Sequence, residues 1–397
     1  MVFSSDELAR FRADTPACKT IIHLNNAGAA LQPLVVQQTV QEHLALEYRL
    51  GGYEAAAIRE EHSQQFYQVV ARLLNTQPAQ IAFAGSATDA YNRALSCIPF
   101  QEGDLILTTA NDYVSNQIAF LQIAERYGAK VQIAPECKEG GVDVQQMQQL
   151  IRNLHPKLVA VTHMPTSSGL IQDVKSIGQT CHEEGVLYLV DACQTAGQLP
   201  LDVQEIACDF LAATARKFLR GPRGGGFLYV SERVLKTNWA PHFLDLHSAN
   251  WSAPDAYTLQ EDARRFETWE RNHAIVQGTA AAIDYALTIG LDRIHQYTRV
   301  LAALAREELQ QNSAVQLTDW GEQLGAIVTF HIPGQDPKKL LYQLREENIH
   351  SSISWGDYAR YDMGRKNVPW VLRWSPHYYN TIEEIKQATK KIFKIIC

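Results

Sequence analysis

Basic side chains are not in excess in this 397-residue chain. It has 36 lysines and arginines against 43 aspartates and glutamates, which gives a formal net charge of −7. Nucleic acids and anionic membrane surfaces favour basic partners. The charge balance gives no electrostatic reason for either kind of partner, and we predict that the protein binds neither nucleic acid nor a membrane surface.

Long apolar stretches are also missing. No segment approaches the run of about 18 apolar residues that a membrane-spanning helix needs. The first 20 residues carry charged side chains throughout and lack the apolar core of a signal peptide. We therefore predict no membrane span, no secretion and a cytoplasmic location.

Cysteines are few and follow no metal-ligand pattern. Their odd number and irregular spacing indicate neither a disulfide framework nor a zinc site, so we predict a reducing compartment and no metal. The seven cysteines are Cys18, Cys97, Cys137, Cys181, Cys193, Cys208 and Cys397. Internal repeats and low-complexity segments are likewise absent, which leaves an ordinary globular chain.

Short apolar runs alternate with helical patterns through the middle of the chain. This alternation predicts the α/β class, with a mostly parallel seven-stranded sheet. The strands are expected at residues 81–83, 104–109, 130–134, 157–162, 186–190, 209–213 and 225–230. The short Gly-Pro-Arg-Gly connection at 221–224 favours an antiparallel arrangement of the last pair.

The chain is long enough for two unequal lobes. We predict a large domain at residues 21–250 and a smaller α+β domain at 251–397, on which residues 1–20 pack. A loop is expected after residue 240, followed by a long helical stretch at 274–310. Further strands are expected at 325–331 and 371–375, and further helices at 337–347 and 381–395.

Two neighbouring strand ends carry the most informative polar residues. The run 186–190 ends at Asp191, and the run 209–213 leads to Lys217. Ligands of open α/β sheets bind at the carboxyl ends of strands, so we expect both side chains at one site. A buried lysine acts as an amine nucleophile, and a carboxylate can keep a pyridinium nitrogen protonated. The pair indicates a pyridoxal phosphate site, although each residue alone would more simply be a helix cap or a solvated side chain.

The residues around this pair carry a family pattern. Asp191 and Gln194 form an Asp-x-x-Gln motif, and Thr214, Arg216 and Lys217 form a tetrad similar to Ser-x-His-Lys. The stretch resembles the class V aminotransferase and cysteine desulfurase family, which has the pyridoxal-phosphate-dependent fold type I. This resemblance covers nearly the whole chain. It implies that Asp191 and Lys217 are catalytic and that Gln194, Thr214 and Arg216 bind the cofactor, with Arg216 in the place of the usual His.

A small-residue loop at 84–90 follows a strand and begins a helix. Backbone N–H groups at a helix N-terminus favour an anion. The loop resembles the family's Gly-Ala-Thr-Glu segment, which implies that Ser86, Ala87 and Thr88 bind the cofactor phosphate. A plain helix N-cap at Ser86 or Thr88 is the alternative.

The resemblance also implies ring and substrate contacts. Tyr113 stands where the family has an aromatic side chain that stacks on the cofactor ring, with a half-buried core tyrosine as the alternative. Thr166 stands where the family often has an Asn near the cofactor hydroxyl, and a threonine hydroxyl can donate or accept. Arg373 matches the family's carboxylate-binding arginine, whose planar fork fits an α-carboxylate. Asn26 and Ala27 belong to a turn that closes the other side of the family's amino-acid site.

A later stretch, 264–272, resembles a family segment that reaches the phosphate of a neighbouring subunit. Trp269 and Glu270 replace Gly and Thr there, and a glutamate would repel a phosphate. This leaves the phosphate contact open, while a homodimer is still expected. The Trp-Glu version, residues 50–56 and the Arg373 segment resemble the branch of hercynylcysteine sulfoxide lyases and isopenicillin epimerase-like proteins.

The cofactor alone permits several reactions on an amino acid. Desulfurases need a mobile cysteine, and residues 350–360 contain none, with the terminal Cys397 a poor substitute. We therefore predict a carbon–sulfur lyase that acts by β-elimination on an S-substituted cysteine or cysteine sulfoxide and releases pyruvate and ammonia. Hercynylcysteine sulfoxide of ergothioneine synthesis is one candidate substrate. The alternatives are a class V aminotransferase or epimerase, a cysteine desulfurase and, least favoured, a catalytically silent cofactor-binding protein.

Overall fold

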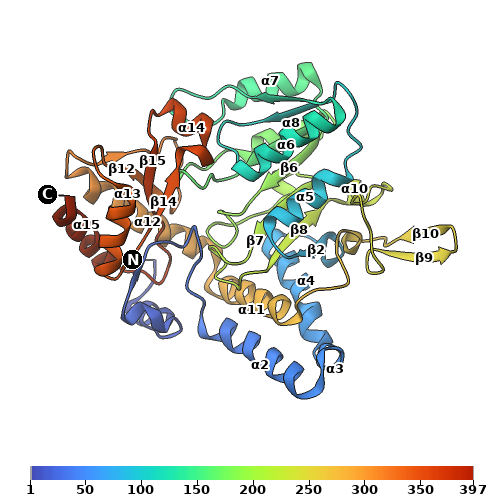
Figure 1. The fold of residues 1–397 in the computed structure, drawn as a ribbon, viewed down its shortest axis with the longest axis horizontal. Helices are drawn as coiled ribbons and strands as arrows, with labels where there is room; N and C mark the ends of the chain where they lie inside the picture. Colours follow the sequence, from blue (N-terminus) through green and yellow to red (C-terminus); the bar gives the residue numbers. More distant parts are fainter. Residues whose placement is uncertain (1, 397) are drawn as a thin grey trace.

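The computed structural model describes residues 2–396, and its largest sheet has seven strands (Figure 1). Strand β8 runs antiparallel to both of its neighbours, β7 and β2, and the other neighbouring pairs are parallel. In sheet order the strands are β2 (Ile81–Ala84), β8 (Gly226–Val230), β7 (Phe210–Thr214), β6 (Leu187–Asp191), β5 (Leu158–Thr162), β3 (Leu105–Thr108) and β4 (Lys130–Ile133). The predicted α/β class and the mostly parallel seven-stranded sheet are therefore confirmed.

Helices cover both faces of this sheet, and successive residues of a strand enter two different hydrophobic clusters. In β5, Leu158 and Ala160 join one cluster, whereas Val159 and Val161 join the other. Burial on both faces explains the continuous apolar runs seen in the sequence. One face packs on α4 (Glu60–Leu74), α7 (Val144–Leu154), α8 (Val174–Glu183) and α11 (His273–Ile289), and the other on α5 (Ala87–Cys97), α6 (Val114–Tyr127) and α10 (Glu232–Leu235).

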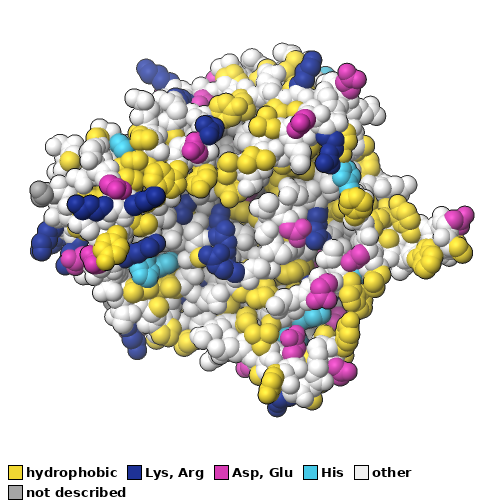
Figure 2. Space-filling view, in the orientation of Figure 1, with side chains coloured by type: hydrophobic (Ala, Val, Ile, Leu, Met, Phe, Trp, Pro, Cys, Tyr) yellow, Lys and Arg dark blue, Asp and Glu magenta, His cyan; other side chains and the backbone are white. Residues whose placement is uncertain are grey.

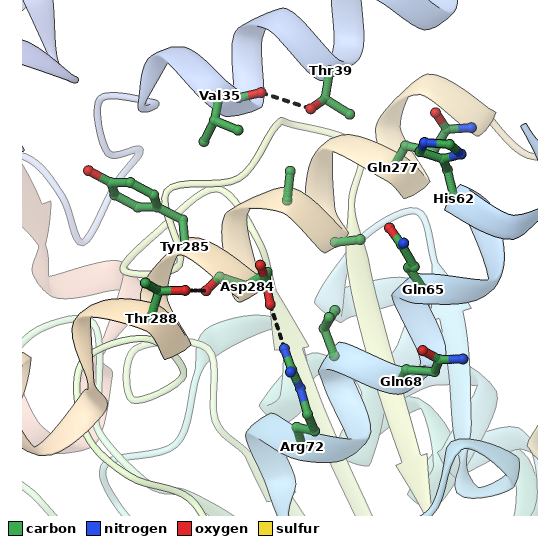
Figure 3. A pocket seen from close by; sticks show the side chains of 13 residues that line it. Val35, Thr39, His62, Gln65, Gln68, Arg72, Gln277, Asp284, Tyr285 and Thr288 are labelled. Carbon is green, nitrogen blue, oxygen red and sulfur yellow. Dashed lines mark hydrogen bonds and ion pairs between the residues drawn. The ribbon is translucent and has the colours of Figure 1, made fainter.

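Helix α11 lies between α4 and α2 (Leu34–Leu50), which continues into α3 (Gly52–Ile58). Arg72 of α4 forms a 2.5 Å ion pair with Asp284 of α11. A surface cavity of about 460 Å³ lies between α2, α4 and α11. It is lined largely by polar side chains such as Gln65, Gln68 and Gln277 (Figure 3). None of the predicted site residues lines this cavity.

A second, antiparallel sheet forms the C-terminal part of the fold. Its order is β11 (Gln316–Leu317), β12 (Val328–His331), β15 (Trp370–Trp374) and β14 (Ser352–Trp355). Around it lie α12 (Leu291–Gln310), α13 (Pro337–Glu346), α14 (Arg360–Arg365) and α15 (Ile382–Ile396).

The N-terminal residues pack on this C-terminal part. Helix α1 (Ser5–Ala13) places the Phe11 ring 5.3 Å from the Tyr378 ring, and Arg12 pairs with Glu384 at 2.7 Å. Strand β1 (Ile22–His23) pairs with β13 (Ile349–His350). The opening segment of the chain is thereby tied to segments more than 300 residues away.

Two predictions for the second half of the chain are wrong. The helical stretch expected at 274–310 is two helices, because the chain bends by 80° at Gly290, which has a φ of +94°. Helix α11 packs on α2 and α4, whereas α12 packs on α15. The expected loop after residue 240 also contains a hairpin, β9 (Ala249–Ala253) and β10 (Ala256–Leu259), which projects from the body of the protein (Figure 1).

The predicted division at residue 250 stays a prediction, and the contacts of α11 and α12 lead us to propose Gly290 as the boundary between the two domains.

Within residues 2–396, no single helix is long and apolar enough to cross a membrane. Helices α11 and α12 reach that length and composition only when they are taken together as a bent pair.

Gly197 allows two loops of the site to touch. Its φ is +86°, and a Cβ at this position would lie 2.5 Å from the backbone N of Leu219. The turn after Gln194 can therefore rest directly on the backbone that follows Lys217.

We predict that Gly197→Ala lowers the free energy of unfolding by about 2–5 kcal/mol, since it adds backbone strain to a steric clash. Denaturant titration measures the change. Gly185→Ala is the matched control, because Gly185 also has a positive φ of +68° but nothing within 4 Å of the added Cβ. It should lose only about 1–2 kcal/mol. Equal losses in the two variants would contradict the proposed close approach.

Candidate active site

Asp191 and Lys217 lie at the carboxyl ends of adjacent parallel strands. Asp191 is the last residue of β6, and Lys217 follows β7 by three residues. Both side chains are buried, at 4% and 7% exposure. The amine of Lys217 lies 6.0 Å from the centre of the Tyr113 ring. Three of the residues predicted for the site thus meet at one edge of the sheet.

The surroundings of Lys217 favour its neutral amine. Burial lowers the pKa of Lys217, and the nearby guanidinium groups of Arg216 and Arg373 lower it further. Cys193 and Asp191 act in the opposite direction. A neutral amine at this position is the nucleophilic form of a lysine.

Asp191 is held by two hydrogen bonds. Asn116 Nδ2 donates to its Oδ2 at 3.1 Å, and the backbone N–H of Cys193 donates to its Oδ1 at 2.9 Å. These bonds fix the carboxylate in one orientation. The sequence analysis did not identify Asn116, because nothing in the local sequence pattern links it to Asp191.

Residues predicted to bind the cofactor and the substrate come together from distant parts of the chain. Gln194 Nε2 donates to Thr166 Oγ1 and to the carbonyl oxygen of Ala27, both at 3.2 Å. Arg373 donates to the carbonyl oxygen of Thr166 at 3.1 Å and to Asn25 Oδ1 at 3.3 Å. The structure thus brings Ala27, Thr166, Gln194 and Arg373 together, and it adds Asn25, the residue before Asn26 in the same turn.

Two further predicted residues brace this turn. Asn26 donates through Nδ2 to the carbonyl oxygen of Ser375 at 2.6 Å and accepts from the Tyr379 hydroxyl. Arg216 donates to the carbonyl oxygen of Gly28. Asn26 is fully buried, so it positions the turn rather than offering a free polar group.

Arg373 is a buried cation with neutral partners. Its side chain is 6% exposed, and the acceptors of its two hydrogen bonds are a carbonyl and an amide oxygen. Burial, with a smaller contribution from Arg216, lowers the pKa of Arg373 to about 10. Its Nε has no hydrogen-bond partner among the described residues. An incoming carboxylate would form charge-assisted hydrogen bonds with this buried guanidinium and would neutralise its charge.

The predicted phosphate loop forms the N-terminus of α5. Ser86 is the helix cap, and its Oγ accepts from the backbone N–H of Asp89 at 3.1 Å. The first N–H groups of a helix have no acceptor within it, so those of Ala87 and Thr88 can bind an anion. Gly226 lets β8 approach, since a Cβ there would lie 2.9 Å from the carbonyl carbon of Ser86. The capping alternative is therefore realised and is compatible with anion binding.

Thr214 lies at the other side of this loop. Its Oγ1 donates to the carbonyl oxygen of Gly225 at 3.3 Å, and the residue is buried. A hydroxyl keeps acceptor capacity when it donates, so a further polar contact remains open to it.

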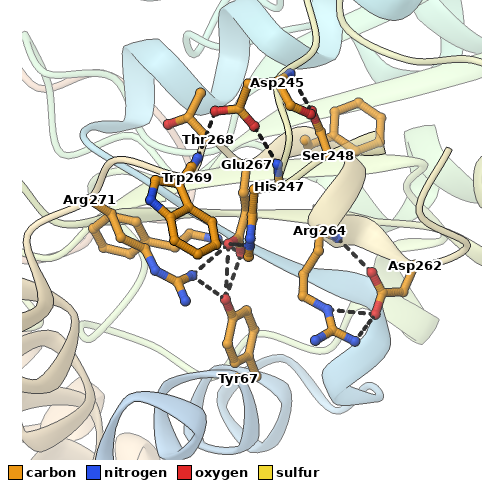
Figure 4. A network of polar contacts seen from close by, with 12 residues as sticks. Tyr67, Asp245, His247, Ser248, Asp262, Arg264, Glu267, Thr268, Trp269 and Arg271 are labelled. Atoms are coloured by element: carbon orange, nitrogen blue, oxygen red, sulfur yellow. Dashed lines mark hydrogen bonds and ion pairs between the residues drawn. The ribbon is translucent and has the colours of Figure 1, made fainter. Parts of the chain in front are cut away.

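The stretch around Trp269 forms a separate polar network (Figure 4). The buried carboxylate of Glu267 accepts from Tyr67, from Arg271 at 2.8 Å and from the backbone N–H of Phe83 at 2.7 Å. Trp269 is exposed to 49%. This network anchors the stretch to α4 and β2.

The comparisons with known proteins agree with this geometry. A family model described as "Aminotransferase class-V" matches residues 22–388. A probable cysteine desulfurase of Pyrococcus abyssi is 28% identical over 386 residues, which cover 94% of each chain. The solved apo structure of a cysteine desulfurase from Thermococcus onnurineus NA1 superposes with a TM-score of 0.90 and 26% identity, over 98% of each chain.

Two structures of a cystine C–S lyase share the fold at 21% identity. One has glycine covalently linked to the pyridoxal phosphate cofactor and a TM-score of 0.86, covering 96% of this chain and 98% of that one. The other holds the product cysteine persulfide and has a TM-score of 0.84, covering 95% and 98%.

The fold and the comparisons define a pyridoxal-phosphate-dependent enzyme of fold type I. The chain belongs to the class V aminotransferase family.

The residues present fit the cofactor. Gln194 is 1% exposed, and its Oε1 has no hydrogen-bond partner within residues 2–396. Two guanidinium groups, those of Arg216 and Arg373, also lie near the buried amine of Lys217. An anionic aromatic group with polar substituents would balance this charge and satisfy the buried amide oxygen.

We predict that Arg373→Lys weakens binding of an amino acid by about 10- to 100-fold, because a lysine cannot form the two-pronged bond to a carboxylate. Titration of the holoenzyme with glycine, followed by absorbance, measures the affinity. The absorbance of the enzyme without glycine should not change. Arg223→Lys is the control, because Arg223 is an exposed arginine of the loop before β8. Unaltered affinity for glycine in Arg373→Lys would exclude the carboxylate role.

Proposed function

We propose that this enzyme cleaves the carbon–sulfur bond of cysteine or of an S-substituted cysteine. The observation that supports this most is the burial of Lys217 and Asp191 beside Arg373, whose hydrogen-bond acceptors are neutral. The relatives of the chain also include proteins named cysteine desulfurases. The comparisons fit the cysteine desulfurase alternative better than the lyase predicted first. Hercynylcysteine sulfoxide, the candidate substrate from the sequence, finds no support in them.

Each residue has a distinct role in this proposal. Pyridoxal phosphate, when bound, supplies an aldehyde that accepts an amine and a ring that withdraws electrons from the substrate Cα. Arg373 binds the substrate carboxylate, and Lys217 Nζ moves the proton at Cα. Asp191 pairs with the ring nitrogen, and the Tyr113 ring stacks on the cofactor. Ser86, Ala87, Thr88, Thr214 and Arg216 hold the phosphate, and Thr166 and Gln194 hold the ring hydroxyl.

Two fates of the sulfur follow from this arrangement. In desulfuration, the sulfur of cysteine passes to an enzyme thiol, so that cysteine and a thiol give alanine and an enzyme persulfide. In β-elimination, the Cβ–S bond breaks with its electron pair on sulfur, and one water molecule converts the remainder to pyruvate and ammonia. The relatives favour the first route, and the lack of a cysteine in residues 350–360 favours the second.

Cys193 is the thiol that would have to serve in desulfuration within the described site. Its neighbouring charges are Asp191, Lys217 and Arg216. Burial raises the pKa of Cys193, and Asp191 raises it further, while the two cations oppose this. A thiol held in its neutral form is a weak nucleophile. Cys193 is therefore the residue on which the two routes can be separated.

We also propose a homodimer. Apolar side chains are exposed on the projecting hairpin and on α2 and α3, at the right and bottom of Figure 2. They include Trp251 at 81%, Tyr53 at 77% and Tyr48 at 93% exposure. Exposed apolar groups of this kind mark protein interfaces.

The decisive experiment gives the holoenzyme cysteine and measures alanine, pyruvate and sulfide, with intact-protein mass spectrometry. Desulfuration predicts alanine and an adduct of about 32 Da that reduction removes. Elimination predicts pyruvate and ammonia in equal amounts and no adduct. If neither alanine nor pyruvate forms, and amino groups pass to a 2-oxo acid instead, carbon–sulfur cleavage is excluded.

The cysteine variants locate the acceptor. Cys193→Ser should abolish alanine formation if Cys193 takes the sulfur, and Cys137→Ser should not, because Cys137 lies on a surface loop away from the predicted site residues. Under elimination, pyruvate formation should survive both substitutions.

A further inference from the structure

A second buried carboxylate lies behind Asp191. Asp112 is 6% exposed and accepts hydrogen bonds from the Thr108 and Thr162 hydroxyls and from the backbone N–H of Tyr113 at 2.8 Å. These donors come from the ends of β3 and β5 and from the cap of α6. Asp112 therefore joins the ends of β3 and β5 to α6, the helix that follows β3.

One amide links this carboxylate to Asp191. Asn116 Nδ2 donates to Asp112 Oδ1 at 3.0 Å and to Asp191 Oδ2 at 3.1 Å. An amide nitrogen has two N–H groups, so each carboxylate receives one. The reverse orientation of the amide would place its oxygen between two carboxylates. Asn116 is 4% exposed, and the surrounding charges leave it one favourable orientation.

The same carboxylate also positions Tyr113. The hydrogen bond from the backbone N–H of Tyr113 to Asp112 fixes the start of α6. From there the Tyr113 ring extends, and its centre lies 6.0 Å from Lys217 Nζ. Asp112 thus controls two groups, the Asp191 carboxylate and the Tyr113 ring, that the proposed site assigns to the ring nitrogen and the ring face of the cofactor.

Two carboxylates joined in this way favour a positive charge near Asp191. Burial raises the pKa of Asp112 to about 6, while its hydroxyl and amide donors oppose this rise. The other titratable groups that act on it or sense it are Asp191, Tyr91 and Tyr188, and both tyrosines are buried and neutral. Asp191 also acts on Lys217, whose own pKa burial lowers, so the pair has negative charge to share with a bound ligand.

We propose that Asp112 and Asn116 are positioning residues that hold Asp191 in place and stabilise, through it, the protonated ring nitrogen of the cofactor. This inference rests on the proposed role of Asp191. If it holds, substitutions of Asp112 and Asn116 change the protonation of the cofactor ring nitrogen, and this change can be measured apart from any loss of stability.

The test uses the holoenzyme loaded with pyridoxal phosphate labelled with ¹⁵N in the ring. Asn116→Leu removes both N–H donors, and the ring ¹⁵N resonance should move toward its unprotonated position. The pH at which the ring nitrogen loses its proton should fall by about one unit, a tenfold change in the equilibrium. Asp112→Asn removes the second charge and should change it in the same direction, which covers the case that Asn116→Leu does not fold.

Gln117→Leu is the matched control. Gln117 is the next residue of α6, and its amide donates to the carbonyl oxygen of Thr109 rather than to a carboxylate. Its substitution should leave the ¹⁵N resonance unchanged. If Asn116→Leu and Asp112→Asn unfold more readily than the wild type but keep the wild-type ¹⁵N resonance, their role is only structural and the proposal is overturned.

Asp191→Asn separates this inference from the site assignment. A shifted ¹⁵N resonance in Asp191→Asn with none in the Asn116 and Asp112 variants would refute only the positioning role. An unchanged resonance in Asp191→Asn would refute both.

Discussion

The buried charge of Arg373 is the constraint around which the rest of the site is built. Arg373 is 6% exposed, and the acceptors of its two hydrogen bonds are neutral oxygens. Burying an unpaired ion costs several kcal/mol. A fold retains such a cost when ligands supply the missing charge. An α-carboxylate is an anion that a guanidinium binds with two parallel hydrogen bonds, so this buried charge itself indicates what binds.

The scaffold meets this constraint with a sheet that is buried on both faces. Its strands end at one edge, where β6 and β7 present Asp191 and Lys217. The Asn25–Gly28 turn and Arg373 reach the same edge from the two ends of the chain, and β15 carries Arg373 on the second sheet. Close backbone contacts at Gly197 and Gly226 then hold the loops together. Activity therefore depends on long-range packing as well as on the catalytic residues.

The sequence was most informative where local pattern and burial coincide. The apolar runs before Asp191 and Lys217 predicted the strands and their meeting point, and α5 begins at Ala87, within the loop that was expected to begin a helix. The bend at Gly290 was missed because α11 and α12 are both apolar enough to read as one helix. Asp112 and Asn116 were missed for a different reason. Each is a single polar residue, which gives no periodic signal. The partner of Asn116, Asp191 at the end of β6, lies 75 positions away in the sequence.

The substrate was harder to predict than the fold, since one set of residues around pyridoxal phosphate serves many reactions. The hercynylcysteine prediction relied on markers such as Trp269 and Glu270, which are exposed. Glu270 lines a surface cavity with Gly85 and Asp89 of the predicted phosphate loop, and neither Lys217 nor Asp191 lines that cavity. The central claim, that Lys217 supplies the amine that would react with the cofactor's aldehyde, does not depend on the substrate. Borohydride reduction of the holoenzyme followed by peptide mapping tests it directly. We expect one cofactor-modified peptide, the one that contains Lys217. A modified peptide with another lysine, or no modified peptide at all, would contradict this role of Lys217.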